Sequence, residues 1–479
     1  MSNPITLKLN AASPAHESVA GWQAETYVLS SAARGGDQAP LPVKLAPDAV
    51  LELELENGTL LLVAAEDAER YLGGAIDRGD GVAGEIQVGP ALRLSGQHLP
   101  AGPSREGAGA WVLKSLRVFK RGPAGMTALA AAGAFQDHQL DHRAGLQRLA
   151  TTAWELSAIE KMPPSDEPAL LFLHGTASST GGSFKSLWGG DQSEMDARTR
   201  LKEAYGDRVY GYEHRSLTES PIANVLDLVN HLPEGARLHV VSHSRGGMLG
   251  ELLARANRLN SDPFTEADIQ RFLEHGKRTG RVGYEADAEN LRKLNQAMKQ
   301  RSLRIERFVR VAGTARGTTL ASGRLDRWAS VMLNLLGKGL MAVPGLQPAA
   351  KGYDLLRGFL LAVVKERTDA RVLPGLEAMM PDSPLVALLN APDVAVDYPL
   401  RVIAGDYQGD GLLSWLGDCL SEAFYGGETD LVVNTPSMSG GAARPQGIWQ
   451  KFLAGPKVTH FSYFERKESA QPLLDALAG

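Results

Sequence analysis

A serine between a predicted strand and a predicted helix places the strongest constraint on this sequence. Residues 238–242 (LHVVS) form an apolar run typical of a buried strand, and residues 248–256 repeat apolar side chains on one helical face. The turn between them, residues 243–247, reads HSRGG. A sharp strand–turn–helix of this kind exposes a serine hydroxyl and requires small residues around it, as Gly246 provides. We therefore predict that Ser244 is a nucleophile.

The alternative interpretation of this turn is a phosphate-binding loop or a merely tight connection between strand and helix. A P-loop would carry the order GxxxxGK[ST], which residues 243–247 lack. Ser242 stands where glycine is usual in a nucleophile turn, and its side chain is small enough to fit. The flanking strand and helix favour the nucleophile interpretation.

A second loop fits the same chemistry. Acyl transfer requires donors aimed at the oxyanion that develops in the transition state. The apolar run Ala169–Leu173 leads into HGTASS at residues 174–179, about 70 residues before Ser244. We expect the backbone N–H groups of Thr176 and Arg245 to form an oxyanion hole, because Arg245 directly follows the nucleophile.

The general base follows from the order of residues along the chain. Enzymes with this turn carry serine, then an acid, then histidine. Only His275 and His460 follow Ser244. His275 lies at the polar end of a predicted helix, where a solvated or capping role fits better. His460 lies near the C-terminus, where the last strand should deliver it, so we predict that His460 is the base.

Two aspartates are candidates for the acid of the triad. Asp406 comes directly after the apolar run at residues 400–404, which is the simpler position. Asp430 precedes a short apolar run at residues 431–433. The residues alone leave both open. The other carboxylates in this interval are less well placed: Asp410, Asp418, Glu422 and Glu428.

Short apolar runs alternate with helical patterns from about residue 166 to residue 479. These runs are Ala169–Leu173 and residues 208–212, 238–242, 308–312 and 400–404. Continuous apolar runs separated by helices predict an α/β domain, with a mostly parallel sheet covered by helices on both faces. Helical insertions are expected at about 262–304 and 325–395. We expect the second insertion, which is rich in apolar residues, to cap the site, with ordinary core helices as the alternative.

Residues 1–125 have a different pattern. Residues 50–56 alternate apolar and acidic side chains, and Asn57-Gly58 then leads into a second apolar run at residues 59–63. This pattern predicts a β-hairpin. We expect a smaller strand-rich N-terminal domain of unknown role, which is a candidate docking surface for a protein partner. A helical connector with a proline-rich end, at residues 126–165, should join it to the α/β domain.

Composition excludes several classes of function. The net charge of −5 provides no basic surface for nucleic acid. Cys419 is the only cysteine, which excludes an internal disulfide. His138 and His142 share a helical face without a third ligand, so we expect no metal, and the proposed triad needs no organic cofactor. With no signal peptide and no apolar run long enough for a transmembrane segment, we expect a cytoplasmic protein whose membrane contact is at most transient.

Several segments together resemble bacterial triacylglycerol lipases and GPI-inositol-deacylase-like hydrolases, both serine esterases of the α/β-hydrolase superfamily. The likeness covers about residues 165–479. It implies an α/β-hydrolase fold, and it favours Asp430 over Asp406, since these families carry an Asp-x-x-Val segment followed by a Ser-Met or Ser-Ser pair. The matching segments are His174-Gly175-Thr176, Ser242 to Gly247, Asp430 to Val433 with Ser437-Met438, His460-Phe461, residues 313–318, and residues 380–384 with Leu389-Asn390.

The resemblance implies hydrolysis of a carboxylic ester, with an acyl ester or a lipid-like small molecule as substrate. Ser244 would attack the acyl carbonyl, His460 would take its proton, and Asp430 would orient the imidazole. A peptidase or a thioesterase would use the same triad. An interaction or signalling module built on a hydrolase scaffold, without catalysis, is the alternative of a different class.

Overall fold

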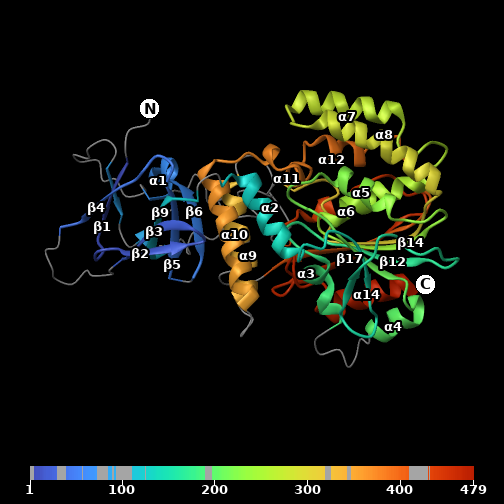
Figure 1. The fold of residues 1–479 in the computed structure, drawn as a ribbon, viewed down its shortest axis with the longest axis horizontal. Coiled ribbons are helices and arrows are strands. Elements are labelled where there is room, and N and C mark those ends of the chain that lie inside the picture. The colour runs from blue at the N-terminus through green and yellow to red at the C-terminus, as the bar shows by residue number, and fades with distance from the viewer. Residues whose placement is uncertain are drawn as a thin grey trace. The chain divides into compact units, whose positions relative to one another are not determined.

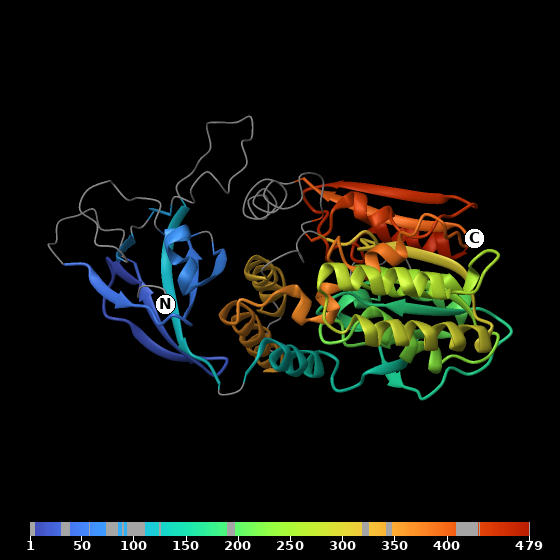
Figure 2. The ribbon, with the colours of Figure 1, turned by 90° about the horizontal axis from the view of Figure 1, so that it is seen from above.

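The computed structural model divides the chain into two compact units (Figures 1 and 2). The first comprises Met1–Phe135 and Gly323–Asp369, and the second comprises Gln136–Ser322 and Ala370–Gly479. The structure describes residues 5–29, 39–56, 58–72, 85–88, 91–92, 111–123, 126–188, 197–318, 325–341, 347–408, 430 and 432–478.

An eight-stranded sheet forms the centre of the second unit, in the order β11-β10-β13-β12-β14-β15-β16-β17. Every neighbouring pair from β13 to β17 is parallel, and β10 runs antiparallel to both of its neighbours. The strands are β10 (Gly145–Leu149), β11 (Leu156–Ala158), β12 (Ala169–Leu173), β13 (Val209–Glu213), β14 (Arg237–His243), β15 (Arg304–Val311), β16 (Leu400–Tyr407) and β17 (Ile448–Gly455).

The central strands are apolar because helices cover both faces of the sheet. All residues of β12 and β13 are buried, as are all but the first residue of β14. The predicted apolar runs coincide with β12 to β16 within a few residues at each end, which confirms the α/β class. Parallel sheets require such runs because neither face meets water.

Figure 1 shows α5 and α6 on one face of this sheet and α3, α4 and α14 on the other. The insertion expected at about 262–304 forms α7 and α8, which lie side by side outside α5 and α6 (Figure 2). The helices are α3 (Thr180–Phe184), α4 (Ala197–Tyr205), α5 (Pro221–Asn230), α6 (Gly246–Ala254), α7 (Glu266–Thr279), α8 (Tyr284–Arg301), α11 (Pro374–Glu377), α12 (Pro384–Leu389) and α14 (Lys467–Ala478), with short 3-10 turns at Lys185–Leu187, Arg255–Asn257, Ala370–Val372 and Thr435–Ser439 (η8).

The strand order reverses at β12. The chain passes from β12 to β13 on one side and then crosses to β14 on the other side. In open α/β sheets, ligands bind beyond the carboxyl ends of the strands at such a switch point. The loops that leave the carboxyl ends of β12 and β14 begin at His174 and Ser244, so the topology brings both predicted site loops to the same edge of the sheet.

The first unit contains two sheets. The sheet in the order β2-β3-β9-β5-β6 is antiparallel, and the sheet in the order β4-β1-β7 has one antiparallel and one parallel pair. The predicted hairpin is confirmed: β5 and β6 pair antiparallel, and Gly58 adopts a φ of +80° in the connecting turn. The elements are β1 (Thr6–Leu9), β2 (Ala15–Val19), β3 (Trp22–Val28), β4 (Leu41–Lys44), β5 (Val50–Leu55), β6 (Leu60–Ala64), a 3-10 turn at Ala65–Asp67, α1 (Ala68–Leu72), β7 (Glu85–Val88), β8 (Ala91–Leu92), β9 (Trp111–Arg121) and α2 (Ala128–Gln139), whose last turn enters the second unit.

Two long helices depart from the expected domain plan. Helices α9 (Asp326–Met341) and α10 (Gln347–Lys365) belong to the first unit, although they were expected to be an insertion in the α/β domain. The Asn334 side chain exchanges hydrogen bonds of 3.0 and 2.7 Å with the backbone of Leu60, and the Ser330 hydroxyl accepts one from the N–H of Leu62. Helix α9 thus covers the edge strand β6, which would otherwise leave unpaired backbone groups.

Helix α10 also packs on the N-terminal sheet. Arg357 forms a buried ion pair with Glu52 of β5, and Phe359 and Leu360 are fully buried. The described apolar side chains of residues 328–364 therefore cover this sheet. The structure does not describe the side chains of Leu335 and Leu336. Of the expected cap at 325–395, the part from Ala370 onward, with α11 and α12, remains in the second unit.

The expected boundary at residue 166 also lies elsewhere. The second unit begins at Gln136, and β10 and β11 are strands of its sheet. The proline-rich residues 163–168 connect β11 to β12 within that sheet, and the N–H of Met162 donates a 2.8 Å hydrogen bond to the carbonyl of His231. Prolines here shape a connection inside one unit and do not separate two domains.

This division of the chain predicts the outcome of two truncations. Deleting residues 1–135 alone should give an aggregating protein, because α9 and α10 lose the sheet that buries Trp328, Phe359 and Leu360, and each such side chain contributes about 1.5–3 kcal/mol when buried. Deleting residues 323–369 as well, with a short Gly-Ser linker in their place, should restore a soluble protein. The N–H of Leu325 donates to the carbonyl of Thr368 (3.3 Å), so the excised ends lie close together.

Soluble yield and thermal unfolding followed by circular dichroism would compare the two truncations. If the protein without residues 1–135 is as soluble and as stable as the full chain, the pairing of α9 and α10 with the N-terminal sheet is wrong.

Candidate functional site

The backbone at Ser244 is strained. Ser244 has a φ of +53°, in the left-handed region that residues other than glycine rarely adopt. It lies between β14 and α6, and its N–H donates a 3.0 Å hydrogen bond to the carbonyl of Val311 in β15. Such strain persists where the surrounding structure fixes it, and it is concentrated at functional sites. The geometry is that expected for a nucleophile turn.

Close contacts explain the residues that flank Ser244. A Cβ atom on Gly246 would collide with the carbonyl oxygen of Leu173 in β12, and one on Gly175 would lie only 2.9 Å from the Cβ of Ser244. Ser242 is fully buried, and its hydroxyl has no hydrogen-bond partner among the described residues. The tight approach is therefore at Gly246 and Gly175, which is why serine is tolerated at position 242.

His460 and Asp430 lie together in the loops that surround β17. The Nδ1–H of His460 donates to the Oδ2 of Asp430 at 2.8 Å, and the backbone N–H of His460 donates to the Asp430 carbonyl at 3.0 Å. Both side chains are buried. With the proton on Nδ1, the Nε2 atom of His460 is left as the basic nitrogen, the tautomer that a general base requires.

The carboxylate of Asp430 receives four hydrogen bonds. Its Oδ1 accepts from the N–H groups of Val432 (3.2 Å) and Val433 (2.9 Å), and its Oδ2 accepts from His460 and from the Tyr463 hydroxyl (3.1 Å). Sequence reasoning did not find Tyr463. The only signal for it was its position three residues after His460.

The second candidate acid has a different partner. The Oδ2 of Asp406 accepts a 2.8 Å hydrogen bond from Gln408, and among the described residues His460 makes no hydrogen bond to Asp406. The structure therefore brings Asp430 to His460 as the resemblance implied. The other carboxylates considered, Asp410, Asp418, Glu422 and Glu428, lie outside the described residues.

His243 links the histidine loop to the serine turn. Its Nε2–H donates to the carbonyl of His460 at 2.9 Å, and the two imidazole rings lie 4.8 Å apart. Burial, with a smaller effect from His460, lowers the pKa of His243 well below its usual value, so the ring is neutral. Because His243 directly precedes Ser244, this contact places the His460 backbone beside the turn that contains Ser244.

The loops after β12 and β14 each contain a backbone N–H group without a protein acceptor among the described residues. Within the part of the chain that the structure describes, the backbone N–H groups of Thr176 and Arg245 have no protein acceptor. The next N–H, that of Ala177, is occupied by the Ser216 hydroxyl at 2.9 Å. The Thr176 side chain contacts the sulfur of Met379 at 3.2 Å, so the segment from Ala370 onward reaches this loop.

Glu213 and His174 lie together beside the loop that follows β12. The Glu213 carboxyl accepts from the N–H of Thr180, at the start of α3, and lies 3.4 Å from the Nε2 of His174. Burial lowers the pKa of His174 to about 3, so the pair is not ionic. Burial also raises the pKa of Glu213 to about 7, against the opposing effect of the Thr180 hydrogen bond.

The guanidinium of Arg245 joins three segments. It donates to the carbonyls of Glu219 (2.7 Å) and Gly375 (3.3 Å) and to the Oδ1 of Asn224 (3.0 Å). The side chain is fully buried, and burial lowers its pKa. Arginine at this position thus ties the nucleophile turn to α5 and to the segment that contains α11.

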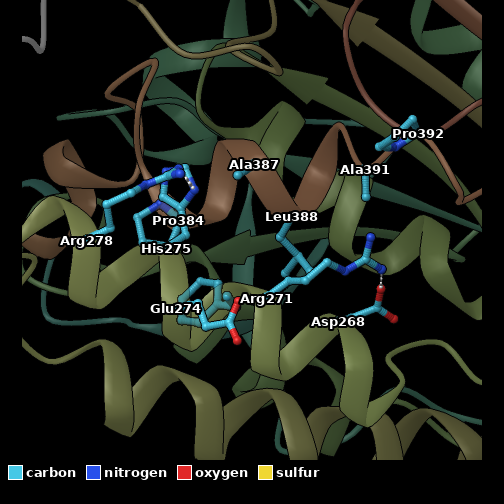
Figure 3. A pocket seen from close by; sticks show the side chains of 11 residues that line it. Asp268, Arg271, Glu274, His275, Arg278, Pro384, Ala387, Leu388, Ala391 and Pro392 are labelled. Atoms are coloured by element: carbon cyan, nitrogen blue, oxygen red, sulfur yellow. Dashed lines mark hydrogen bonds and ion pairs between the residues drawn. The ribbon is translucent and has the colours of Figure 1, made fainter.

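His275 lies apart from these residues. It is on α7, where its Nε2–H donates to the carbonyl of Asp382 (2.7 Å) and its Nδ1 accepts from Arg278. Figure 3 shows it at the rim of a pocket of about 450 Å³ between α7 and α12, whose lining includes Arg271 and Leu388 but none of the predicted triad residues. The structure gives His275 a role in linking α7 to the loop before α12.

The described residues contain no helix with the length and apolar character needed to cross a bilayer. They also contain no group of three or more His, Cys, Asp or Glu side chains arranged to hold a metal ion.

Solved structures similar to this chain include lipase 1 from Pelosinus fermentans, with 12% identity and a TM-score of 0.41, covering 66% of this chain and 99% of that chain. The Staphylococcus hyicus lipase has 14% identity and a TM-score of 0.35, covering 66% and 95%. Esterase B from Lactobacillus rhamnosis has 14% identity and a TM-score of 0.25, covering 72% and 93%. These are likenesses of fold alone.

The eight-stranded sheet, its helical layers and the strained serine turn after β14 are those of the α/β-hydrolase fold. Comparison with curated proteins finds no match. One family model matches residues 141–281 and 282–478, which together are more than half of the chain. The chain therefore belongs to the family described as the domain of unknown function DUF7379.

Proposed function

We propose that this protein hydrolyses carboxylic esters, with acyl or lipid-like esters as substrates, through a Ser244–His460–Asp430 triad. One observation carries the proposal: the hydrogen bond from His460 to Asp430, held by His243 against the strained turn of Ser244. Serine hydrolases on unrelated folds share this arrangement of nucleophile, base and orienting acid.

In the first step the Oγ of Ser244 attacks the acyl carbonyl and the Nε2 of His460 takes its proton. Asp430 stabilises the imidazolium that forms, and the N–H groups of Thr176 and Arg245 stabilise the oxyanion. The protonated His460 then protonates the departing alcohol, which leaves an acyl-enzyme on Ser244. Water, deprotonated by His460, hydrolyses that ester and restores the serine.

The segment from Ala370 onward supports an apolar acyl group as the part of the substrate near the oxyanion loop. Met379 contacts Thr176, and the neighbouring Leu376 and Met380 are buried with it. Flexible methionine side chains adapt to apolar ligands of different shape. We therefore propose an acyl ester in preference to a peptide, which would require backbone hydrogen bonds along an extended site.

Ser244→Ala should abolish turnover of p-nitrophenyl esters. The loss of kcat should be about 10⁶, as for loss of the serine in subtilisin, because the triad residues act as a unit. Ser242→Ala is the matched control: it removes a buried serine hydroxyl two residues away that has no hydrogen-bond partner among the described residues. Initial rates and thermal unfolding of both variants would check this. Activity that survives in Ser244→Ala and is lost in Ser242→Ala would refute the assignment of the nucleophile.

Asp430→Asn should lower kcat by about 10⁴, because the amide can hold the imidazole in the wrong tautomer, as the same change does in chymotrypsin-like enzymes. Asp406→Asn should change kcat only a few-fold, because the Oδ2 of Asp406 accepts a hydrogen bond from Gln408. Steady-state kinetics on both variants compares the two acids. The reverse ranking would assign the role to Asp406, which lies near the end of β16.

Glu213→Gln should stabilise the protein at alkaline pH. A carboxyl whose folded pKa is raised from 4.5 to about 7 binds more protons folded than unfolded, so its contribution to the free energy of unfolding falls as pH rises from about 4.5 to 7. Glutamine keeps the acceptor for Thr180 and does not ionise.

The melting temperatures of wild type and Glu213→Gln, measured from pH 4.5 to 8.5, would test this. The difference should grow with pH in favour of the variant, toward about 3 kcal/mol in the free energy of unfolding above pH 7. A difference that does not change with pH would mean that Glu213 is ionised at little cost in the folded protein.

A further inference from the structure

We propose that Tyr463 is a positioning residue of the triad, whose hydroxyl holds the Asp430 carboxylate in the orientation that His460 needs. This inference rests on the proposed function. It assigns a role to a buried side chain outside the three triad residues.

The contact geometry supports a dedicated hydrogen bond. Tyr463 is 2% exposed, and its O–H donates to the Oδ2 of Asp430 at 3.1 Å, the same oxygen that accepts from His460. The Oδ1 atom is held separately by two backbone N–H groups, those of Val432 and Val433. With donors on both oxygens, the carboxylate cannot rotate without breaking a hydrogen bond, so its plane is fixed toward the imidazole.

The neighbouring strand leaves space for this hydroxyl. A Cβ atom on Gly405 of β16 would collide with the Oη atom of Tyr463 and crowd the Val458 side chain. A residue with any side chain at position 405 would therefore displace the phenol from Asp430. Glycine at this point of a buried strand is costly for a sheet, which suits a site where another side chain approaches closely.

The phenol is a donor at every working pH. Burial, followed by the negative charge of Asp430, raises the pKa of Tyr463 well above its usual value. Asp406 adds to this effect from the end of β16. The phenol therefore stays protonated and keeps its hydrogen bond while His460 exchanges its proton.

Removing the hydroxyl should affect His460 in a specific direction. The donor from Tyr463 withdraws negative charge from Asp430, and without it the carboxylate would stabilise the imidazolium of His460 more strongly. The groups that face His460 and can titrate or carry charge are Asp430, Tyr463 and the neutral His243, with Asp406 beyond Tyr463 and His174 beyond His243. Of these, only the Asp430 interaction changes when the phenol becomes a phenyl ring.

The test compares Tyr463→Phe with Tyr205→Phe. Tyr205 is also buried, and its hydroxyl bonds the Nδ1 of His239 at 2.6 Å, near the beginning of β14 and remote from the triad loops. In Tyr463→Phe the acidic limb of the pH profile of kcat/KM should move to higher pH by about 0.5–1 unit, and kcat should fall about tenfold. Tyr205→Phe should change neither, although both variants lose one buried hydrogen bond.

A fluorophosphonate titration would count the reactive sites in each preparation, so that misfolded protein does not enter kcat. If Tyr463→Phe is too unstable to purify, Gly405→Ala should produce the same shift of the acidic limb by displacing the hydroxyl. An acidic limb that stays at its wild-type pH, with kcat within twofold of wild type, would overturn the positioning role.

Failure of the proposed function has a different signature. If the wild-type protein neither turns over esters nor reacts with fluorophosphonate, the ester hydrolase proposal is wrong. Tyr463 is then tested by the low-field proton resonance of the His460–Asp430 hydrogen bond, whose titration midpoint should still move to higher pH in Tyr463→Phe. A midpoint unchanged by the substitution would reject the proposed role.

Discussion

The left-handed backbone of Ser244 is the constraint on which the site depends. A residue with a side chain at a φ of +53° is held there only if the strand before it and the helix after it are both fixed. Gly246 packs against Leu173, so the start of α6 contacts the end of β12. Gly175, in the loop that follows β12, packs against Ser244. The same close packing that strains the turn also sets the positions of the backbone N–H groups of Thr176 and Arg245.

A buried ion cluster connects the helix after this turn to η8, which follows Asp430 in the chain. Glu251 of α6 pairs with Arg310 of β15 (2.6 Å) and with Arg444 (2.8 Å), and Arg310 also donates to the carbonyl of Met438 in η8. Burial opposes ionisation of Glu251, yet the guanidinium groups of Arg444 and Arg310 lower its pKa. Removing one member of such a cluster typically costs 3–5 kcal/mol, since a charge remains buried without its partner. Helix α6, which begins two residues after Ser244, and the segment that follows Asp430 therefore share one anchor.

Much of the second unit could be predicted because its physical requirements appear locally in the sequence. A strand buried on both faces must be apolar throughout, as Ala169–Leu173 is, and a strained serine turn needs glycine at position 246. The order of serine, acid and histidine then left few candidates for the base. The choice between Asp430 and Asp406 depended on resemblance, because loop geometry decides which carboxylate reaches the imidazole and the sequence does not encode it locally.

The features that sequence reasoning missed depend on contacts between distant segments. An apolar helical face shows that Trp328 and Phe359 need a covering surface, but not that the surface is a sheet formed more than 200 residues earlier. Prolines at residues 163–168 suggested a domain linker, whereas they connect two strands of one sheet. The role of Tyr463 could not be predicted for the same reason. A tyrosine near the C-terminus indicates no function until the fold places Asp430 beside it.

If Ser244 is a nucleophile, a fluorophosphonate should react with its hydroxyl, and the residue that carries the label can be identified. The intact mass of the treated protein, followed by mapping of its proteolytic peptides, should show one phosphonyl group per chain on the peptide that contains Ser244. A protein that gains no mass, or that carries the group on a residue other than Ser244, would contradict the account.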